Sequence, residues 1–157
     1  MQFDGCPKVL HTVSGIRLKD KVALVTGGAS GIGQAIACCF AEQGAAIRVV
    51  DLNGEAARET AERITKLGGT ATAHVCDVTD AANTRAVFQA ILGLSHIDIL
   101  VNSAGVSHVG RLDNTGDDDF MRLFRVNVLG THHAMQECIQ SMVARRSGVI
   151  VNLASID

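Results

Sequence analysis

The stretch Val22–Gly33 reads VALVTGGASGIG, and it decides the fold. Its first four residues are apolar and predict a buried strand, which a glycine-rich turn follows. Glycines at 27, 31 and 33 leave space where a Cβ would block the main chain, so the turn can lie against a ligand. The helix that begins near Gly31 directs unpaired N–H groups and the positive end of its dipole to the same place. The stretch therefore predicts a cradle for a pyrophosphate; the alternative is a glycine-rich turn that binds nothing.

Strand and helix patterns alternate along the rest of the chain. Further strands are predicted over residues 45–51, 70–76, 97–101 and 148–153, and helices over residues 31–43, 54–67, 81–94 and 117–145. This alternation predicts an α/β fold, a Rossmann-type doubly wound parallel sheet with its five strands in the order 3-2-1-4-5. Residues 1–15 are expected to form an N-terminal arm, and residues 16–157 a single Rossmann domain.

Helical spacing of apolar residues predicts the buried face of each helix. The predicted core residues are Ile32, Ile36, Cys39 and Phe40, then Ala57, Ala61 and Ile64, then Val87, Ala90, Ile91 and Leu94, and finally Phe120, Leu123, Phe124, Val128, Met135, Ile139 and Met142.

Composition excludes several classes of protein. Apolar residues make up 47% and charged residues 19%, which is typical of a globular chain. The net charge of −2 offers no basic surface, so nucleic acid and anionic membranes are poor partners. No apolar run could span a bilayer, and the first twenty residues lack the apolar segment of a secretory signal. Five scattered cysteines without a C-x-x-C pair suit reduced thiols in the cytoplasm, and the scattered histidines predict no metal site.

Asp51 ends the second predicted strand, downstream of the glycines. A carboxylate there can accept both hydroxyls of an adenosine ribose and repels a 2′-phosphate. Its neighbours Leu52 and Asn53 are not basic, and neither is Ser30 before the second glycine of the turn. The cofactor is therefore predicted to be NAD; the alternative is an ordinary aspartate at a strand end that faces water.

The glycine spacing T-G-x-x-x-G-x-G, over residues 26–33, resembles that of the short-chain dehydrogenase/reductase family. Members of this family are single-domain Rossmann oxidoreductases that use NAD(H) or NADP(H). The resemblance implies that the cofactor is bound by the turn and the first helical residues, namely Gly27, Ser30, Gly31, Ile32 and Gly33.

Two further loops carry the same resemblance. Asp77 and Val78, after the third strand, are similar to the family's adenine-binding step, in which a carboxylate meets the adenine amino group and an apolar side chain packs on the ring. Asparagine, serine, alanine and glycine at the end of the fourth strand resemble the family's N-N-A-G motif, where small residues admit the cofactor ribose: Asn102, Ser103, Ala104 and Gly105. Ser103 departs from that pattern, which matters only if the family contact is made by the side chain.

Asn127 and Ser155 are the catalytic candidates. The resemblance implies that Asn127 binds a water at a local distortion of the long helix and links it to a proton relay; the alternative is a core asparagine bonded to nearby carbonyls. Ser155, in NLASI after the fifth strand, matches the family serine that holds the substrate carbonyl or hydroxyl. Taken alone, it is only a serine near a terminus.

The family's general acid–base is a tyrosine with a lysine four residues later, downstream of that serine. This sequence has no tyrosine, and its lysines all precede the fourth strand. The resemblance thus covers about residues 16–157 and stops before the proton-transfer pair. We expect a chain that is inactive as given, either the N-terminal part of a longer protein or a truncated product.

The leading hypothesis is an NAD-dependent oxidoreductase that moves hydride between nicotinamide and a small alcohol or carbonyl substrate. The alternatives are a non-catalytic NAD-binding module and a truncated, non-functional product. The resemblance also implies a homo-oligomer for the full-length protein, paired through the long helix.

Overall fold

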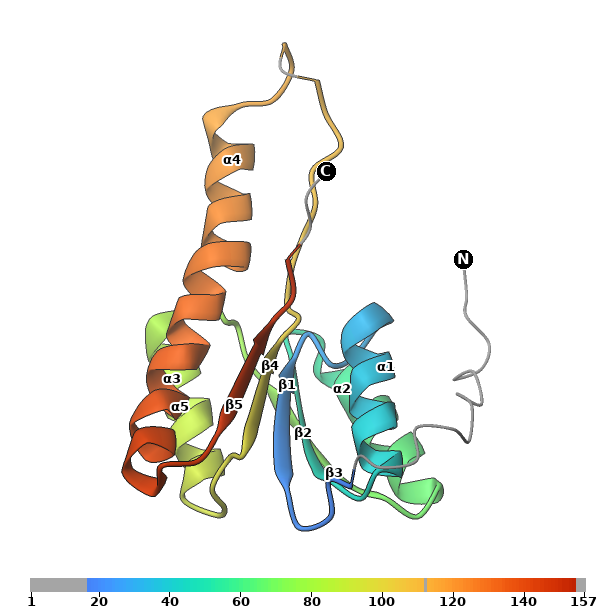
Figure 1. The fold of residues 1–157 in the computed structure, drawn as a ribbon. Helices are drawn as coiled ribbons and strands as arrows, with labels where there is room; N and C mark the ends of the chain where they lie inside the picture. Colours follow the sequence, from blue (N-terminus) through green and yellow to red (C-terminus); the bar gives the residue numbers. More distant parts are fainter. Residues whose placement is uncertain (1–16, 112, 155–157) are drawn as a thin grey trace.

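The computed structural model describes residues 17–111 and 113–154, so the predicted arm at residues 1–15 lies outside the described part. Within it, a parallel sheet has the order β3-β2-β1-β4-β5, which confirms the predicted Rossmann-type fold and strand order (Figure 1). The strands are β1 (Val22–Thr26), β2 (Ala46–Asp51), β3 (Thr70–Val75), β4 (Ile99–Asn102) and β5 (Val149–Asn152). The helices are α1 (Gly31–Glu42), α2 (Gly54–Lys66), α3 (Ala81–Leu92), α4 (Asp117–Phe124) and α5 (Thr131–Arg145).

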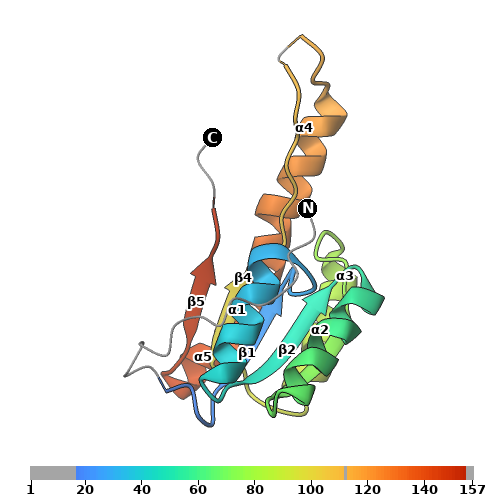
Figure 2. The ribbon, with the colours of Figure 1, turned by 90° about the vertical axis from the view of Figure 1, so that its right-hand side faces the viewer.

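Helices cover both faces of the sheet, α1 and α2 on one side and α3 and α5 on the other (Figures 1 and 2). The pleat divides the core accordingly, because successive side chains of a strand point to opposite faces. Ala23 and Val25 of β1 belong to the cluster under α1 and α2, whereas Leu24 between them belongs to the cluster under α3 and α5.

The buried faces of α1, α3 and α5 differ from the sequence prediction. For α2 the predicted core of Ala57, Ala61 and Ile64 is confirmed. In α1 the buried residues are Gly33, Ala37 and Cys38, and Ile32 is 67% exposed. The reason is that α1 packs its backbone closely on β1, so its smallest residues face the sheet.

The predicted core of α3 did not include Phe88, its main core residue. Phe88 is fully buried together with Thr84 and Ile91, whereas Ala90 is exposed. Leu94 is 85% exposed, because the helix ends at Leu92. Of the predicted residues, Ile91 is buried and Val87 packs partly buried against the same core.

The last predicted helix begins at Asp117 and ends at Arg145 as expected, but it has three parts. Between α4 and α5 lies a π-helical segment, η1 (Arg125–Gly130). Helix α4 extends beyond the ends of the strands and buries no residue, so Phe120 of the predicted stripe is 67% exposed (Figures 1 and 2). Within the described residues no helix is both long and apolar enough to cross a membrane.

Helix α5 packs on the sheet through residues spaced four apart, Ala134, Cys138 and Met142. Of the predicted stripe only Met142 is buried, and Ile139 is 43% exposed. The prediction missed Ala134 and Cys138, whose small side chains allow the helix to approach the sheet, whereas Met135 of the predicted stripe packs partly buried against the same core.

Asp98, directly before β4, joins four segments at the amino ends of the strands. Its Oδ2 accepts the Val22 N–H at 2.9 Å and its Oδ1 accepts Nη1 of Arg145 at 3.2 Å. Its own carbonyl oxygen accepts the N–H of Val149, the first residue of β5. Burial alone would raise the pKa of Asp98, but the Val22 hydrogen bond and the neighbouring cationic side chains outweigh it and hold the pKa below its ordinary value.

We predict that Asp98→Asn lowers the free energy of unfolding by about 2 kcal/mol, because a charged acceptor of buried donors is lost. Since the folded-state pKa lies below the unfolded-state pKa, the carboxylate stabilises the fold fully above about pH 4, and this contribution disappears as the pH falls through the folded-state pKa. Urea unfolding followed by circular dichroism at several pH values measures both effects. Asp113→Asn is the matched control, because Asp113 pairs with Arg111 on the surface, and it should cost less than about 0.5 kcal/mol. Equal losses for the two variants would contradict the prediction.

Candidate functional site

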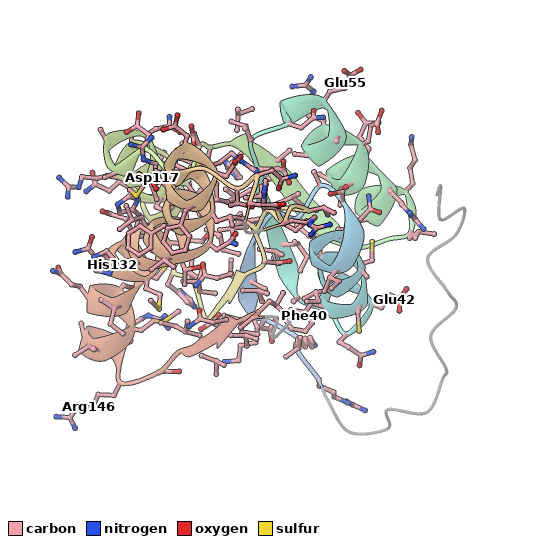
Figure 3. All side chains as sticks on the ribbon, turned by 90° about the horizontal axis from the view of Figure 1, so that it is seen from above. Phe40, Glu42, Glu55, Asp117, His132 and Arg146 are labelled. Carbon is pink, nitrogen blue, oxygen red and sulfur yellow. The ribbon has the colours of Figure 1, made fainter. Side chains whose placement is uncertain are left out.

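The turn after β1 lies where the strand order reverses. Strand β1 sits between β2 and β4, and chain connections leave in opposite directions on its two sides. Ligands of open α/β sheets bind outside the carboxyl ends of the strands at such a point. Figure 3 looks down on this edge, with α1 and α2 on one side of the strands and the long helix on the other.

The glycines of the turn have different roles. Gly27 has φ +65°, and a Cβ there would lie 2.7 Å from the Cα of Ala104. A Cβ at Gly33 would collide with the Gly27 carbonyl oxygen. These two glycines permit close packing of main chain. Gly31, with φ +54°, has nothing within 4 Å of its Cβ position, so it faces open space.

The N-terminus of α1 is open as well. Ser30 is the N-cap residue, but its side chain makes no capping hydrogen bond. By contrast, Asn53 caps α2 and Asp80 caps α3 with side-chain oxygens. The first N–H groups of α1 therefore remain available, and the positive end of the helix dipole lies beside them. Ser30 and Ile32, both exposed, flank the open face of Gly31.

Ala29 of the turn is held through both its N–H and its carbonyl oxygen. The Ala29 N–H donates to Oδ2 of Asp51 at 3.1 Å, so the carboxylate predicted to bind a ribose does lie beside the turn. The Ala29 carbonyl oxygen accepts Nε2 of Gln34 at 3.2 Å and Oγ1 of Thr60 at 3.4 Å. Gln34 also donates to Oγ1 of Thr60 at 2.9 Å. Because Thr60 is fully buried, α2 takes part in fixing this turn.

The loop after β4 packs against the same turn. Oγ1 of Thr26 accepts the N–H groups of Ser103 at 3.2 Å and Ala104 at 3.3 Å. The contact of Ser103 is thus made by its main chain, which a serine provides as well as an asparagine. Asn102 is buried and donates Nδ2 to Oδ1 of Asn152 at 2.8 Å, and its own Oδ1 has no hydrogen-bond partner in the described part of the chain.

Asp77 and Val78 follow β3 after one intervening residue, and the last residue of β3 pairs with Asp51 in the sheet. Oδ1 of Asp77 accepts the N–H and the hydroxyl of Thr79, at 2.9 and 2.7 Å. The Val78 side chain is only 8% exposed, because it packs against Gly130 of η1.

Asn127 lies in η1, and the helix distortion implied for this position is present. Its side chain pairs with the main chain of Val106, accepting the N–H and donating to the carbonyl oxygen, both at 2.9 Å. Because Val106 follows Gly105, this pair ties the long helix to the loop after β4. Ser155 lies outside the described residues.

Thiol and metal chemistry find little support at this edge. Burial raises the pKa of Cys76, and burial together with Glu137 raises that of Cys138 to about 12, so both thiols stay protonated at neutral pH. Among residues 17–111 and 113–154 no three histidine, cysteine or acidic side chains gather as metal ligands would.

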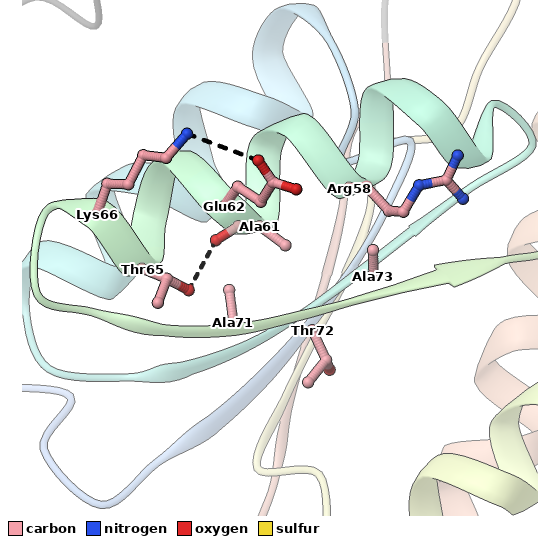
Figure 4. A pocket seen from close by; sticks show the side chains of 8 residues that line it. All are labelled: Arg58, Ala61, Glu62, Thr65, Lys66, Ala71, Thr72 and Ala73. Carbon is pink, nitrogen blue, oxygen red and sulfur yellow. Dashed lines mark hydrogen bonds and ion pairs between the residues drawn. The ribbon is translucent and has the colours of Figure 1, made fainter.

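A hollow between α2 and the edge strand β3 is a separate feature (Figure 4). Part of its polar wall is already paired: Lys66 forms an ion pair with Glu62 at 3.6 Å, and Thr65 donates to the Ala61 carbonyl oxygen at 2.9 Å. It lies away from the switch point and contains none of the predicted site residues.

Sequence reasoning missed three residues that shape this edge: Gln34, Thr60 and His133. Thr60 had one available signal, since it falls on the apolar face of α2 among Ala57, Ala61 and Ile64. A polar residue in that position requires a buried partner. His133, which donates to the Val78 carbonyl oxygen, carried no such signal.

The parallel sheet, the glycine turn and the carboxylate beside it define a Rossmann-type α/β domain, a class that binds dinucleotides at this edge. Residues 21–157 match the family described as short chain dehydrogenase. The chain belongs to this family.

Among its relatives, the D-threitol dehydrogenase of Mycolicibacterium smegmatis is 44% identical over 143 residues, which cover 88% of this chain and 54% of that protein. The crystal structure of a gluconate 5-dehydrogenase from Burkholderia cenocepacia, in complex with NADP and tartrate, matches with a TM-score of 0.84 and 39% identity over 88% of this chain and 55% of that one. A 7α-hydroxysteroid dehydrogenase complexed with NADH and 7-oxo glycochenodeoxycholic acid matches with a TM-score of 0.83 and 37% identity, over the same shares. The chain spans about half the length of the curated relatives it matches.

The different surroundings of the glycines lead to a prediction about stability. Gly33→Ala should lower the free energy of unfolding by more than about 2 kcal/mol, because its methyl group meets fixed main chain. Gly31→Ala should cost only the left-handed backbone strain, about 1 kcal/mol. Gly68→Ala, with φ +89° and open space after α2, is the matched control for that strain. Urea denaturation of the three variants measures the difference, and equal losses would argue against close packing at Gly33.

Proposed function

We propose that this chain binds NAD(H) at the carboxyl edge of the sheet, as the cofactor-binding portion of a short-chain oxidoreductase. The observation that carries the proposal is the hydrogen bond from the Ala29 N–H to Asp51, which brings a carboxylate against the glycine turn. The solved relatives that hold NADP or NADH support a nicotinamide cofactor in this fold.

The residues at this edge fit a dinucleotide. The open space at Gly31 and the uncapped first turn of α1 suit a pyrophosphate, because main-chain N–H groups and the helix dipole favour an anion there. Asp51 would hold the adenosine ribose, and Asp77 the adenine amino group. The small residues 103–105 would leave room for the second ribose.

The preference for NAD over NADP rests on Asp51. Each of its oxygens already accepts one main-chain N–H, from Ala29 and from Asn53, so the carboxylate is held in place beside the turn. A fixed negative charge accepts ribose hydroxyls and repels a 2′-phosphate. Relatives with NADP and with NADH both occur, so the preference depends on local residues such as this one.

The cofactor would supply hydride transfer at its nicotinamide ring, to or from the carbon of a small alcohol or carbonyl compound. Within this chain, Asn127 would organise the loop beside the reacting groups and Ser155 would hydrogen-bond the substrate oxygen. The similarity to D-threitol dehydrogenase favours a polyol or the corresponding ketose.

The chain lacks the residue type that its family uses for proton transfer. The sequence contains no tyrosine, and a phenol is what the family resemblance requires as general acid–base. This absence favours a second candidate for the chain by itself, a nicotinamide-binding module without turnover.

We also propose a cellular compartment and an oligomeric state. The five cysteines are scattered and form no C-x-x-C motif, a spacing that suits a reducing compartment, so we propose that the protein is cytoplasmic. Exposed apolar side chains on the long helix, among them Phe120, Phe124 and Val128, suit pairing of two copies of the full-length protein.

Titration with NADH and NADPH tests the cofactor assignment. The chain should bind NADH more tightly, and Asp51→Asn should reduce this preference by about tenfold, equivalent to about 1.4 kcal/mol, because the charge that repels the 2′-phosphate is gone. Glu59→Gln on the exposed side of α2 removes the same charge away from the turn and should leave the preference unchanged. If neither nucleotide binds the wild-type chain, the cofactor proposal is wrong; an unchanged preference in Asp51→Asn would remove only the role of Asp51.

We also predict that the 157-residue chain binds NADH without turnover of D-threitol or small ketones. The change in nicotinamide absorbance measures turnover, with the full-length D-threitol dehydrogenase as the positive control. Turnover by the chain that disappears in Asp51→Asn would show that another of its groups transfers the proton.

A further inference from the structure

The long helix and the loop after β3 meet at Val78 through two residues about one turn apart. Nδ1 of His133 lies 2.9 Å from the Val78 carbonyl oxygen. At Gly130 a Cβ would lie 2.7 Å from Cγ2 of Val78, so here the bare main chain of the helix contacts the valine. The side chain and the carbonyl group of Val78 are therefore both held by the same helix.

The direction of the His133 hydrogen bond is fixed by its acceptor. A carbonyl oxygen can only accept, so Nδ1 carries the proton.

The peptide group between Val78 and Thr79 connects His133 to Asp77. Its carbonyl oxygen accepts the histidine proton, and its N–H donates to Oδ1 of Asp77 at 2.9 Å. The Thr79 hydroxyl donates to the same oxygen at 2.7 Å. Oδ1 of Asp77 is thus engaged, whereas Oδ2 accepts no hydrogen bond from the described residues.

We propose that His133 is a positioning residue for the adenine end of the cofactor, an inference that rests on the proposed function. It holds the Val78–Thr79 peptide, and that peptide orients the Asp77 carboxylate so that Oδ2 faces the ligand. Helix α5 thereby contributes to cofactor binding without touching the cofactor. The neighbouring His132 is exposed on the same helix and makes no such contact.

The two adjacent histidines provide a matched experiment on the 157-residue chain. His133→Ala should weaken NADH binding by about tenfold, the effect of one lost hydrogen bond, and His132→Ala should leave it unchanged. His133→Asn should restore most of the affinity, because its Nδ2 can donate to the same carbonyl oxygen. Reduced nicotinamide mononucleotide, which lacks the adenosine, should bind wild type and His133→Ala equally.

A double-mutant cycle distinguishes positioning from general support of the fold. In an Asp77→Asn background, His133→Ala should cause little further loss of NADH affinity, because both changes act on one contact. Full additivity, or equal NADH affinity of His133→Ala and wild type, overturns the inference while leaving the proposed function intact. Absence of NADH binding to the wild-type chain overturns both.

If His133→Ala does not fold, Gly130→Ala provides a second test. Its methyl group would push against Val78 from the same helix and should also weaken NADH binding, with no effect on the mononucleotide. An unchanged affinity for NADH in a folded Gly130→Ala chain would likewise overturn the inference.

Discussion

The close approach of main chain between the turn after β1 and the loop after β4 is the contact on which the site depends. Only a residue without a Cβ can occupy Gly27, since a Cβ would come within 2.7 Å of Ala104. Thr26 secures the approach by accepting two N–H groups from the opposite loop. These contacts fix the two segments relative to each other. Helix α1 therefore begins at the switch point of the sheet, and its free N–H groups face the open side of Gly31.

The two ends of the sheet satisfy their polar groups differently. At the amino ends, Asp98 is buried and accepts hydrogen bonds from β1 and from the last turn of α5, which ties the layers together. At the carboxyl ends, several groups have no hydrogen-bond partner among the described residues. They include the first N–H groups of α1 and Oδ1 of Asn102. The amino ends are thus joined by buried side-chain contacts, although Nε of Arg145 has no hydrogen-bond partner among the described residues, and the carboxyl ends leave main-chain N–H groups open beside Gly31.

The long helix serves both the core and the ligand edge. Its α5 part packs on the sheet through small residues, whereas α4 extends beyond the strands. The π-helical segment between them brings Asn127 against Val106 and Gly130 against Val78. One irregular turn therefore contacts two loops of the ligand edge.

Local patterns in the sequence determined the order of elements, the strand order and the place of the glycine turn, because periodicity and glycine spacing act over a few residues. They also placed Asp51 at a strand end, which the parallel order then brought to the turn. Only the tertiary structure decided which helix face is buried, as Ile32 and Phe88 show, since that depends on how closely each helix approaches the sheet. It alone decided the contacts of Thr60 with Ala29 and of His133 with Val78, which join residues 31 and 55 positions apart. Such pairings leave no periodic trace in the sequence, because each depends on two segments that only folding brings together.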